Sequence, residues 1–123
     1  MDYARGHETI LLVEDEELLR HVVLDMLGQL GYRVLGARNG EEALALAEEY
    51  PGKIDVLVTD VLMPGLAGPQ LADSLRCSRP DLKVIFISGD MDADPSLSPD
   101  AARLPKPFTI RMLASKLREV LQS

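Results

Sequence analysis

Acidic and hydroxyl side chains follow three short apolar runs of this sequence, at the point where each run ends. The pair Glu14-Asp15, the single Asp60 and the hydroxyl of Ser88 occupy these positions. Three carboxylates held close together repel one another, so they stay ionised only beside a cation. Ligand sets made of oxygen alone favour Mg²⁺, Mn²⁺ or Ca²⁺ over Zn²⁺. If the fold gathers these side chains, the sequence predicts a site for a hard divalent cation.

Phosphoryl transfer is the chemistry that this set of side chains best supports. Mg²⁺ takes one or two carboxylates, keeps several waters and completes its shell with phosphate oxygens. A carboxylate such as Asp60 can act as the nucleophile and form an acyl phosphate. The transferring group also needs a second cation, and a lysine supplies a point charge. We assign that role to Lys106, which lies between Pro105 and Pro107 in a stretch of stiff backbone.

The composition fits one globular domain rather than a disordered chain. The chain has 123 residues, of which 46% are hydrophobic and 27% charged. A net charge of −7 argues against direct binding to nucleic acid or anionic lipid. Cys77 has no partner for an internal disulfide, and no apolar run reaches the roughly 20 residues that span a bilayer. We therefore expect a cytoplasmic protein without a membrane span, with residues 1–8 as an N-terminal tail and 9–122 as the domain.

The elements that must position these side chains alternate between strands and helices along the chain. Buried strands are predicted over Thr9–Val13, Val56–Thr59 and Lys83–Ser88, and shorter ones near 32–35 and 103–104. Apolar residues recur at the helical period after each acidic or polar break. Candidate caps support the helix ends, and these are Gly31, Asn39 with Glu42 in a capping box, and Thr109.

This alternation predicts an α/β fold with a parallel sheet and helices on both of its faces. In such an open sheet, ligands bind outside the carboxyl ends of the strands, where the strand order switches. The fold by itself would therefore bring Glu14-Asp15, Asp60 and Ser88 to one edge of the sheet. No internal repeat, linker or second domain is evident.

Four short motifs, taken together and in order, resemble the receiver domains of two-component response regulators. The resemblance extends from about Thr9 to Leu121 and implies a flavodoxin-like (βα)5 fold, doubly wound around a five-stranded parallel sheet of order 2-1-3-4-5. Each motif alone is weak evidence, whereas four of them at strand ends and in this order are specific. The motifs are Val13-Glu14-Asp15-Glu16, Thr59-Asp60-Val61-Leu62-Met63-Pro64-Gly65, Ile87-Ser88-Gly89 and Lys106-Pro107-Phe108.

The resemblance implies a role for each site residue in a phosphorelay. Asp60 is the expected phosphoacceptor, and the phosphodonor is the phosphohistidine of a histidine kinase or of a phosphotransfer domain. Mg²⁺ would be held by Glu14, Asp15, Asp60 and the backbone carbonyl of Leu62. Ser88 and Lys106 would contact phosphoryl oxygens, and the Lys106-Pro107 peptide would be cis. Phosphorylation would then switch binding to a downstream output domain or protein, and the chain would catalyse its own phosphorylation and dephosphorylation without being a stand-alone enzyme.

Two departures from the family pattern concern the output surface. Arg103 occupies the position, three residues before the lysine, where many members carry an aromatic switch residue. The stretch between Ser88 and Lys106 is short and contains Pro95 and Pro99, which disfavour a long helix. We therefore expect a shortened or irregular fourth helix and an altered output face. The loop motifs also resemble receivers attached to hybrid histidine kinases, and a stand-alone regulator and an excised domain both remain open.

Three alternatives start from the same residues. A degenerate receiver would bind a partner without phosphorylation, although the full set of site residues argues against it. A phosphatase of the haloacid dehalogenase type would need a second Asp where Leu62 stands. A flavodoxin-like cofactor binder would need a phosphate-binding loop after the first strand, where the four acids of residues 14–17 would repel phosphate.

Overall fold

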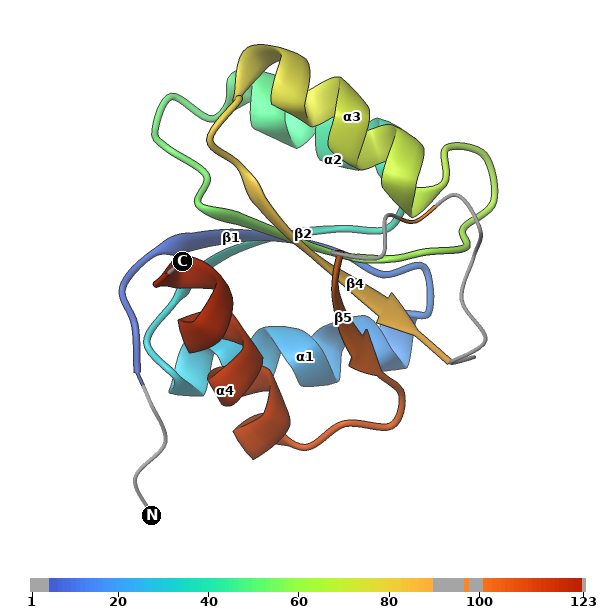
Figure 1. The fold of residues 1–123 in the computed structure, drawn as a ribbon. Helices are drawn as coiled ribbons and strands as arrows, with labels where there is room; N and C mark the ends of the chain where they lie inside the picture. The colour runs from blue at the N-terminus through green and yellow to red at the C-terminus, as the bar shows by residue number, and fades with distance from the viewer. Residues whose placement is uncertain (1–4, 90–96, 98–100, 123) are drawn as a thin grey trace.

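The computed structural model describes residues 5–89, 97 and 101–122, which form five strands and four helices (Figure 1). In chain order these are β1 (Thr9–Val13), α1 (Glu17–Gln29), β2 (Arg33–Ala37), α2 (Gly40–Glu49), β3 (Val56–Asp60), α3 (Gly68–Ser78), β4 (Lys83–Ser88), β5 (Ala102–Pro105) and α4 (Ile110–Leu121).

All neighbouring strands of the sheet are parallel, and their order is β2-β1-β3-β4-β5. This confirms the predicted doubly wound fold and its strand order. Helices α2 and α3 cover one face of the sheet, and α1 and α4 cover the other (Figure 1). The strand order reverses between β1 and β3, so the switch point lies between these two central strands.

The two faces of the sheet build two separate hydrophobic cores. In β1, Leu11 and Val13 belong to the core under α2 and α3, whereas Ile10 and Leu12 belong to the core under α1 and α4. Every residue of β1 and β3 is buried, as a strand covered on both faces requires. These two central strands provide a rigid base for the residues that follow them.

The helix ends largely follow the predicted caps. The Asn39 side chain accepts a hydrogen bond from the Glu42 N–H at 2.8 Å, and Thr109 accepts one from the Met112 N–H at 3.1 Å. Gly31 has a φ of 97°, a value that favours glycine after a helix. The capping box differs in one detail, because the Glu42 carboxylate accepts from the Arg38 N–H rather than from Asn39.

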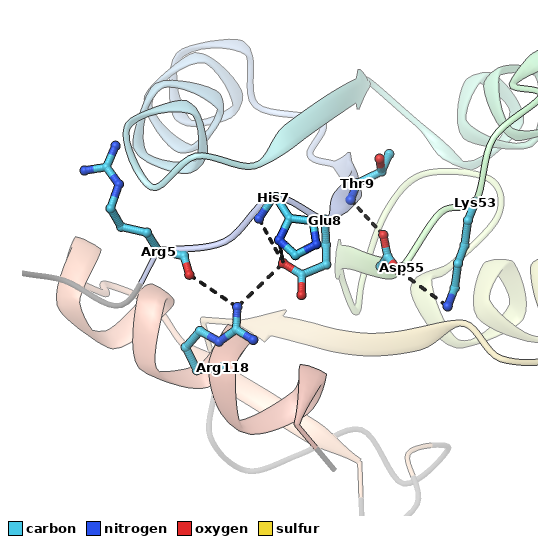
Figure 2. A network of polar contacts seen from close by, with 7 residues as sticks. All are labelled: Arg5, His7, Glu8, Thr9, Lys53, Asp55 and Arg118. Atoms are coloured by element: carbon cyan, nitrogen blue, oxygen red, sulfur yellow. Dashed lines mark hydrogen bonds and ion pairs between the residues drawn. The ribbon is translucent and has the colours of Figure 1, made fainter.

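Residues 5–8, within the segment predicted to be a tail, lie against the domain (Figure 2). The guanidinium of Arg118 in α4 donates to the Arg5 carbonyl at 3.3 Å and lies 3.6 Å from the Glu8 carboxylate. The Gly6 N–H donates to the Leu30 carbonyl at 2.9 Å. This segment therefore connects the beginning of β1 to α4 and to the end of α1.

Two predictions concern the chain between β4 and β5. The shortened or irregular fourth helix falls on residues 90–100, which apart from Leu97 lie outside the described residues and leave that prediction open. The short strand predicted near Arg103 is confirmed as β5 at the sheet edge. Within the described residues, no helix has the length and apolar character needed to cross a membrane.

Candidate functional site

The predicted site residues meet at the carboxyl edge of the sheet. Glu14 and Asp15 directly follow β1, Asp60 is the last residue of β3, and Ser88 is the last residue of β4. Lys106 directly follows β5. The two central strands thus contribute all three acids, and the next two strands of the sheet contribute the hydroxyl and the cation.

The three acids form a compact cluster. Carboxylate oxygens of Glu14, Asp15 and Asp60 lie within 4.8 Å of one another. Glu14 and Asp60 are buried, with 1% and 5% of their surface exposed, whereas Asp15 faces solvent. The Lys106 ammonium lies 3.0 Å from Asp60 Oδ1 and 3.3 Å from Glu14 Oε1, so it bridges the two buried carboxylates.

The donor set of this cluster fits a hard divalent cation. Asp60 Oδ1 and Glu14 Oε1 are fully buried, and neither accepts a well-aligned hydrogen bond from a described residue, although both lie in ion-pair range of Lys106. Buried acceptors normally have hydrogen-bond partners, and the exceptions call for an explanation such as an ion. The three carboxylates of the cluster together carry more negative charge than the single Lys106 ammonium offsets. The cluster can therefore accept a further cation bound through oxygen.

Burial and charge together shift the pKa values at the site. Desolvation, reinforced by the nearby Glu14 carboxylate, raises the pKa of Asp60 to about 7, and Lys106 only partly opposes this shift. Burial acts to lower the pKa of Lys106, but its contacts with Asp60 and Glu14 outweigh burial and raise it. Lys106 therefore stays charged near neutral pH, while Asp60 without a bound cation holds a proton at mildly acidic pH.

The raised pKa of Asp60 predicts a pH-dependent stability of the cation-free protein. Between its unfolded pKa of 3.8 and its folded value of about 7, the folded carboxyl binds more protons than the unfolded one, so stability falls as pH rises through this window. We expect a loss on the order of 2 kcal/mol, reduced from the full shift by solvent screening. Denaturant unfolding of the wild type and of Asp60→Asn, at several pH values and in the presence of a chelator, measures this change in the free energy of unfolding. A wild-type profile parallel to that of the variant would contradict it.

The structure places the two remaining predicted residues at the edge of the cluster. The Ser88 carbonyl accepts the Lys106 N–H at 2.9 Å, which fixes the chain after β5 beside the end of β4. Ser88 itself is half-buried. The Leu62 side chain is 77% exposed in the connection after β3. The contact of the Ser88 hydroxyl with a phosphoryl oxygen and the cation contact of the Leu62 carbonyl both stay predictions.

Three further residues, for which the sequence predicted no role, hold the site in place. The buried Arg20 guanidinium donates to the Glu14 carbonyl at 3.0 Å. The buried Thr59 hydroxyl donates to the Asp60 carbonyl at 3.0 Å. Gly68 begins α3 against the backbone of Asp60. Thr59 begins the second motif, but no local signal indicates these roles, because an arginine in a first helical turn, a threonine in a strand and a glycine before a proline are all ordinary.

Gly68 leaves no room for a side chain next to Asp60. A Cβ at this position would lie 2.2 Å from the Asp60 carbonyl oxygen and 3.2 Å from the Val61 Cα, and backbone cannot rotate away as a side chain can. We expect Gly68→Ala to destabilise the protein by about 1–3 kcal/mol and to displace Asp60. Gly28→Ala is the matched control, because nothing lies within 4 Å of its Cβ and its position in the last turn of α1 accepts alanine. Equal melting temperatures for the two variants would show that a Cβ at position 68 does not clash with the Asp60 backbone.

The parallel sheet of order β2-β1-β3-β4-β5, with acids at the carboxyl ends of its central strands and a lysine after its edge strand, defines a doubly wound, flavodoxin-like α/β fold. The family model for the response regulator receiver domain matches residues 10–118. This chain therefore belongs to the response regulator receiver family, and it is a receiver domain of two-component phosphorelay signalling.

Individual relatives agree with the family assignment. The sensor kinase CckA of Brucella abortus is 43% identical over 121 residues, a match that covers 95% of this chain but only 13% of that kinase. The crystal structure of the receiver domain of the hybrid histidine kinase CckA has a TM-score of 0.80 at 43% identity and covers 93% of this chain and 99% of that one. The response regulator TrrA of Thermotoga maritima, solved in complex with Mg²⁺-BeF, has a TM-score of 0.77 at 32% identity. The match covers 93% of this chain and 99% of that one.

Proposed function

We propose that Asp60 accepts a phosphoryl group from a phosphohistidine and that this modification switches binding to a downstream partner. The observation that carries the proposal is the pair of contacts at Asp60, which is buried beside Glu14 and lies 3.0 Å from the Lys106 ammonium. These contacts hold the Asp60 carboxylate in place at the carboxyl edge of the sheet. The TrrA complex supports the proposal, since that receiver binds Mg²⁺-BeF.

The proposed transfer exchanges one bond at phosphorus for another. An ionised Asp60 oxygen attacks phosphorus, the bond from phosphorus to the histidine nitrogen breaks, and the imidazole leaves as a neutral group after taking up a proton. Lys106 pairs with a phosphoryl oxygen as charge moves, and the Ser88 hydroxyl donates a hydrogen bond to another. Water then attacks the acyl phosphate, releases inorganic phosphate and returns Asp60 to its carboxylate form.

The acidic cluster also supports a proposal for the residues that would hold Mg²⁺. Asp60 and Asp15 would contact the ion, Glu14 would contact it directly or through water, and the Leu62 backbone carbonyl would supply a neutral oxygen. When bound, Mg²⁺ supplies positive charge that neutralises the phosphoryl oxygens. The same charge favours the ionised form of Asp60, which is the nucleophilic form.

The partners that we propose follow from the family. The phosphodonor is a histidine kinase or a phosphotransfer domain, and the downstream partner is an output domain or protein. The chain spans only 13% of the length of the CckA kinase, so membership of a hybrid kinase is one of two arrangements, with a stand-alone regulator as the other. A cytoplasmic location stays a prediction. The net charge of −7 supports the absence of direct nucleic-acid binding.

NMR with beryllium fluoride tests the function without a cognate kinase. We would record amide spectra of the wild type with Mg²⁺ alone, with beryllium fluoride alone and with both. Large shifts at Asp60, Ser88 and Lys106 that require both additions are expected. Shifts beyond the site would map the face that changes on phosphorylation.

The same spectra distinguish the degenerate receiver. If neither Mg²⁺ nor the combination changes the spectrum, the chain binds its partner in the unmodified state and the proposed phosphoryl transfer is wrong. A change with Mg²⁺ alone, without further change on adding beryllium fluoride, would leave a cation site but no phosphoacceptor. Turnover of phosphate esters would instead favour the phosphatase alternative.

A further inference from the structure

Three hydrogen bonds form a closed ring between Glu14 and the beginning of α1. The Glu16 N–H donates to Glu14 Oε2 at 3.0 Å. The Arg20 N–H donates to the Glu16 carbonyl at 2.9 Å, which begins the helix. The Arg20 guanidinium then reaches back and donates to the Glu14 carbonyl at 3.0 Å. The ring ties both the backbone and the carboxylate of Glu14 to one helical turn.

The ring determines which oxygen of Glu14 faces the acidic cluster. Because Oε2 accepts from the Glu16 N–H, the carboxylate can rotate only by breaking that hydrogen bond. Its other oxygen, Oε1, is left buried beside Lys106 with no well-aligned hydrogen-bond donor among the described residues. Asp15 lies between the two ends of the ring, so its backbone is restrained as well.

Arg20 is an unusual residue to bury at this point. Its side chain is only 10% exposed, and the carboxylate that pairs with it across 3.9 Å belongs to the exposed Glu17. Removing a guanidinium from water is costly, and here its short hydrogen bond ends on a neutral carbonyl. An apolar residue would fill the same helical position at lower cost, so stability alone does not explain a cation there.

We propose that Arg20 is a positioning residue of the receiver site, which holds Glu14 so that Oε1 faces the cation position. This inference rests on the proposed function and adds a residue that acts through Glu14 rather than on the phosphoryl group. Residues that orient metal ligands from behind commonly change metal affinity by about 10–100-fold when they are replaced. The printed contacts of its guanidinium are with the Glu14 backbone carbonyl and the exposed Glu17 carboxylate, so Arg20 acts on the backbone of Glu14.

Arg20→Met and Arg20→Lys provide the test. Methionine keeps the length and apolar stem of the side chain but cannot donate, so we expect Mg²⁺ to bind about tenfold more weakly in an NMR titration. Lysine can still donate to a single carbonyl and should restore most of the affinity. Amide hydrogen exchange in chelator supplies a second readout, in which Arg20→Met should speed exchange of the Glu16 N–H.

Arg79→Met is the matched control. Arg79 also donates through its guanidinium to backbone carbonyls, those of Ala47, Tyr50 and Gly52 at 2.9 Å each, but it lies in the connection that enters β4, at the opposite edge of the sheet. This variant should lose stability without a change in Mg²⁺ affinity. If Arg20→Met likewise keeps wild-type Mg²⁺ affinity and Glu16 exchange, the positioning role is wrong.

Two further outcomes keep this inference separate from the proposed function. If Arg20→Met does not fold, amide hydrogen exchange of the wild type tests the inference instead. A Glu16 N–H that is not protected from exchange would show that the ring does not form, and the positioning role would be wrong. If wild type binds Mg²⁺ but accepts no phosphoryl group, the proposed function fails while the Mg²⁺ and exchange measurements still test Arg20.

Discussion

Replacing Asp60 by asparagine is expected to abolish phosphorylation. Asparagine keeps the size of the side chain at the end of β3 but removes the nucleophilic carboxylate oxygen. Wild type incubated with Mg²⁺ and a small phosphodonor such as acetyl phosphate should gain one phosphoryl group by intact-protein mass spectrometry, and Asp60→Asn should gain none. We expect complete loss of labelling, because among the described acids only Asp60 and Glu14 are buried and contact Lys106. The Glu14 carboxylate is held by the hydrogen bond from the Glu16 N–H to its Oε2.

Asp73→Asn is the control for this experiment. Asp73 is an exposed residue of α3, away from the strand ends, so its replacement should leave labelling at the wild-type level. Persistent labelling of Asp60→Asn would show that another group is the acceptor. The raised pKa of Asp60 predicts that asparagine stabilises the cation-free fold at neutral pH, so this variant should stay folded, which circular dichroism checks.

Lys106→Met should have the second largest effect, on the rate of phosphorylation rather than on its site. The ammonium lies 3.0 Å from Asp60, in direct contact with the proposed nucleophile. Removing a preorganised charge of this kind typically slows a reaction by about 10²–10³-fold. Mg²⁺ affinity should stay the same or rise, since a competing positive charge is removed from three carboxylates. Time courses of labelling and an NMR titration with Mg²⁺ measure the two quantities.

Lys116→Met is the matched variant, because Lys116 lies on α4 and pairs with the exposed Glu119 at 3.0 Å. Surface pairs of this kind contribute little, so its rate and Mg²⁺ affinity should equal those of wild type. A Lys106→Met protein that is labelled as fast as wild type would remove the lysine from the mechanism. Weaker Mg²⁺ binding in that variant would instead indicate that Lys106 mainly holds the acids in place.

Much of the fold could be predicted because the relevant signals are local. Residues 10–13 of β1 and 56–58 of β3 are apolar without interruption, so the residue types alone indicate burial on both faces. Asn39 and Thr109 cap helices through neighbours three residues away, a distance that sequence spacing determines. The sheet order, in contrast, depended on resemblance to a family, because strand length and composition do not specify neighbours.

The sequence by itself determined which residues meet at the site. Carboxyl ends of parallel strands share one edge, so the fold class alone brings Glu14-Asp15, Asp60 and Ser88 together. Lys106 was assigned from its place between two prolines and from the family resemblance. Only the tertiary structure decided how they meet: Glu14 is buried while Asp15 is exposed, Lys106 bridges two acids, and Arg20 and Gly68 hold the backbone from behind. These features depend on distances between elements that packing sets, and residue order does not encode such distances locally.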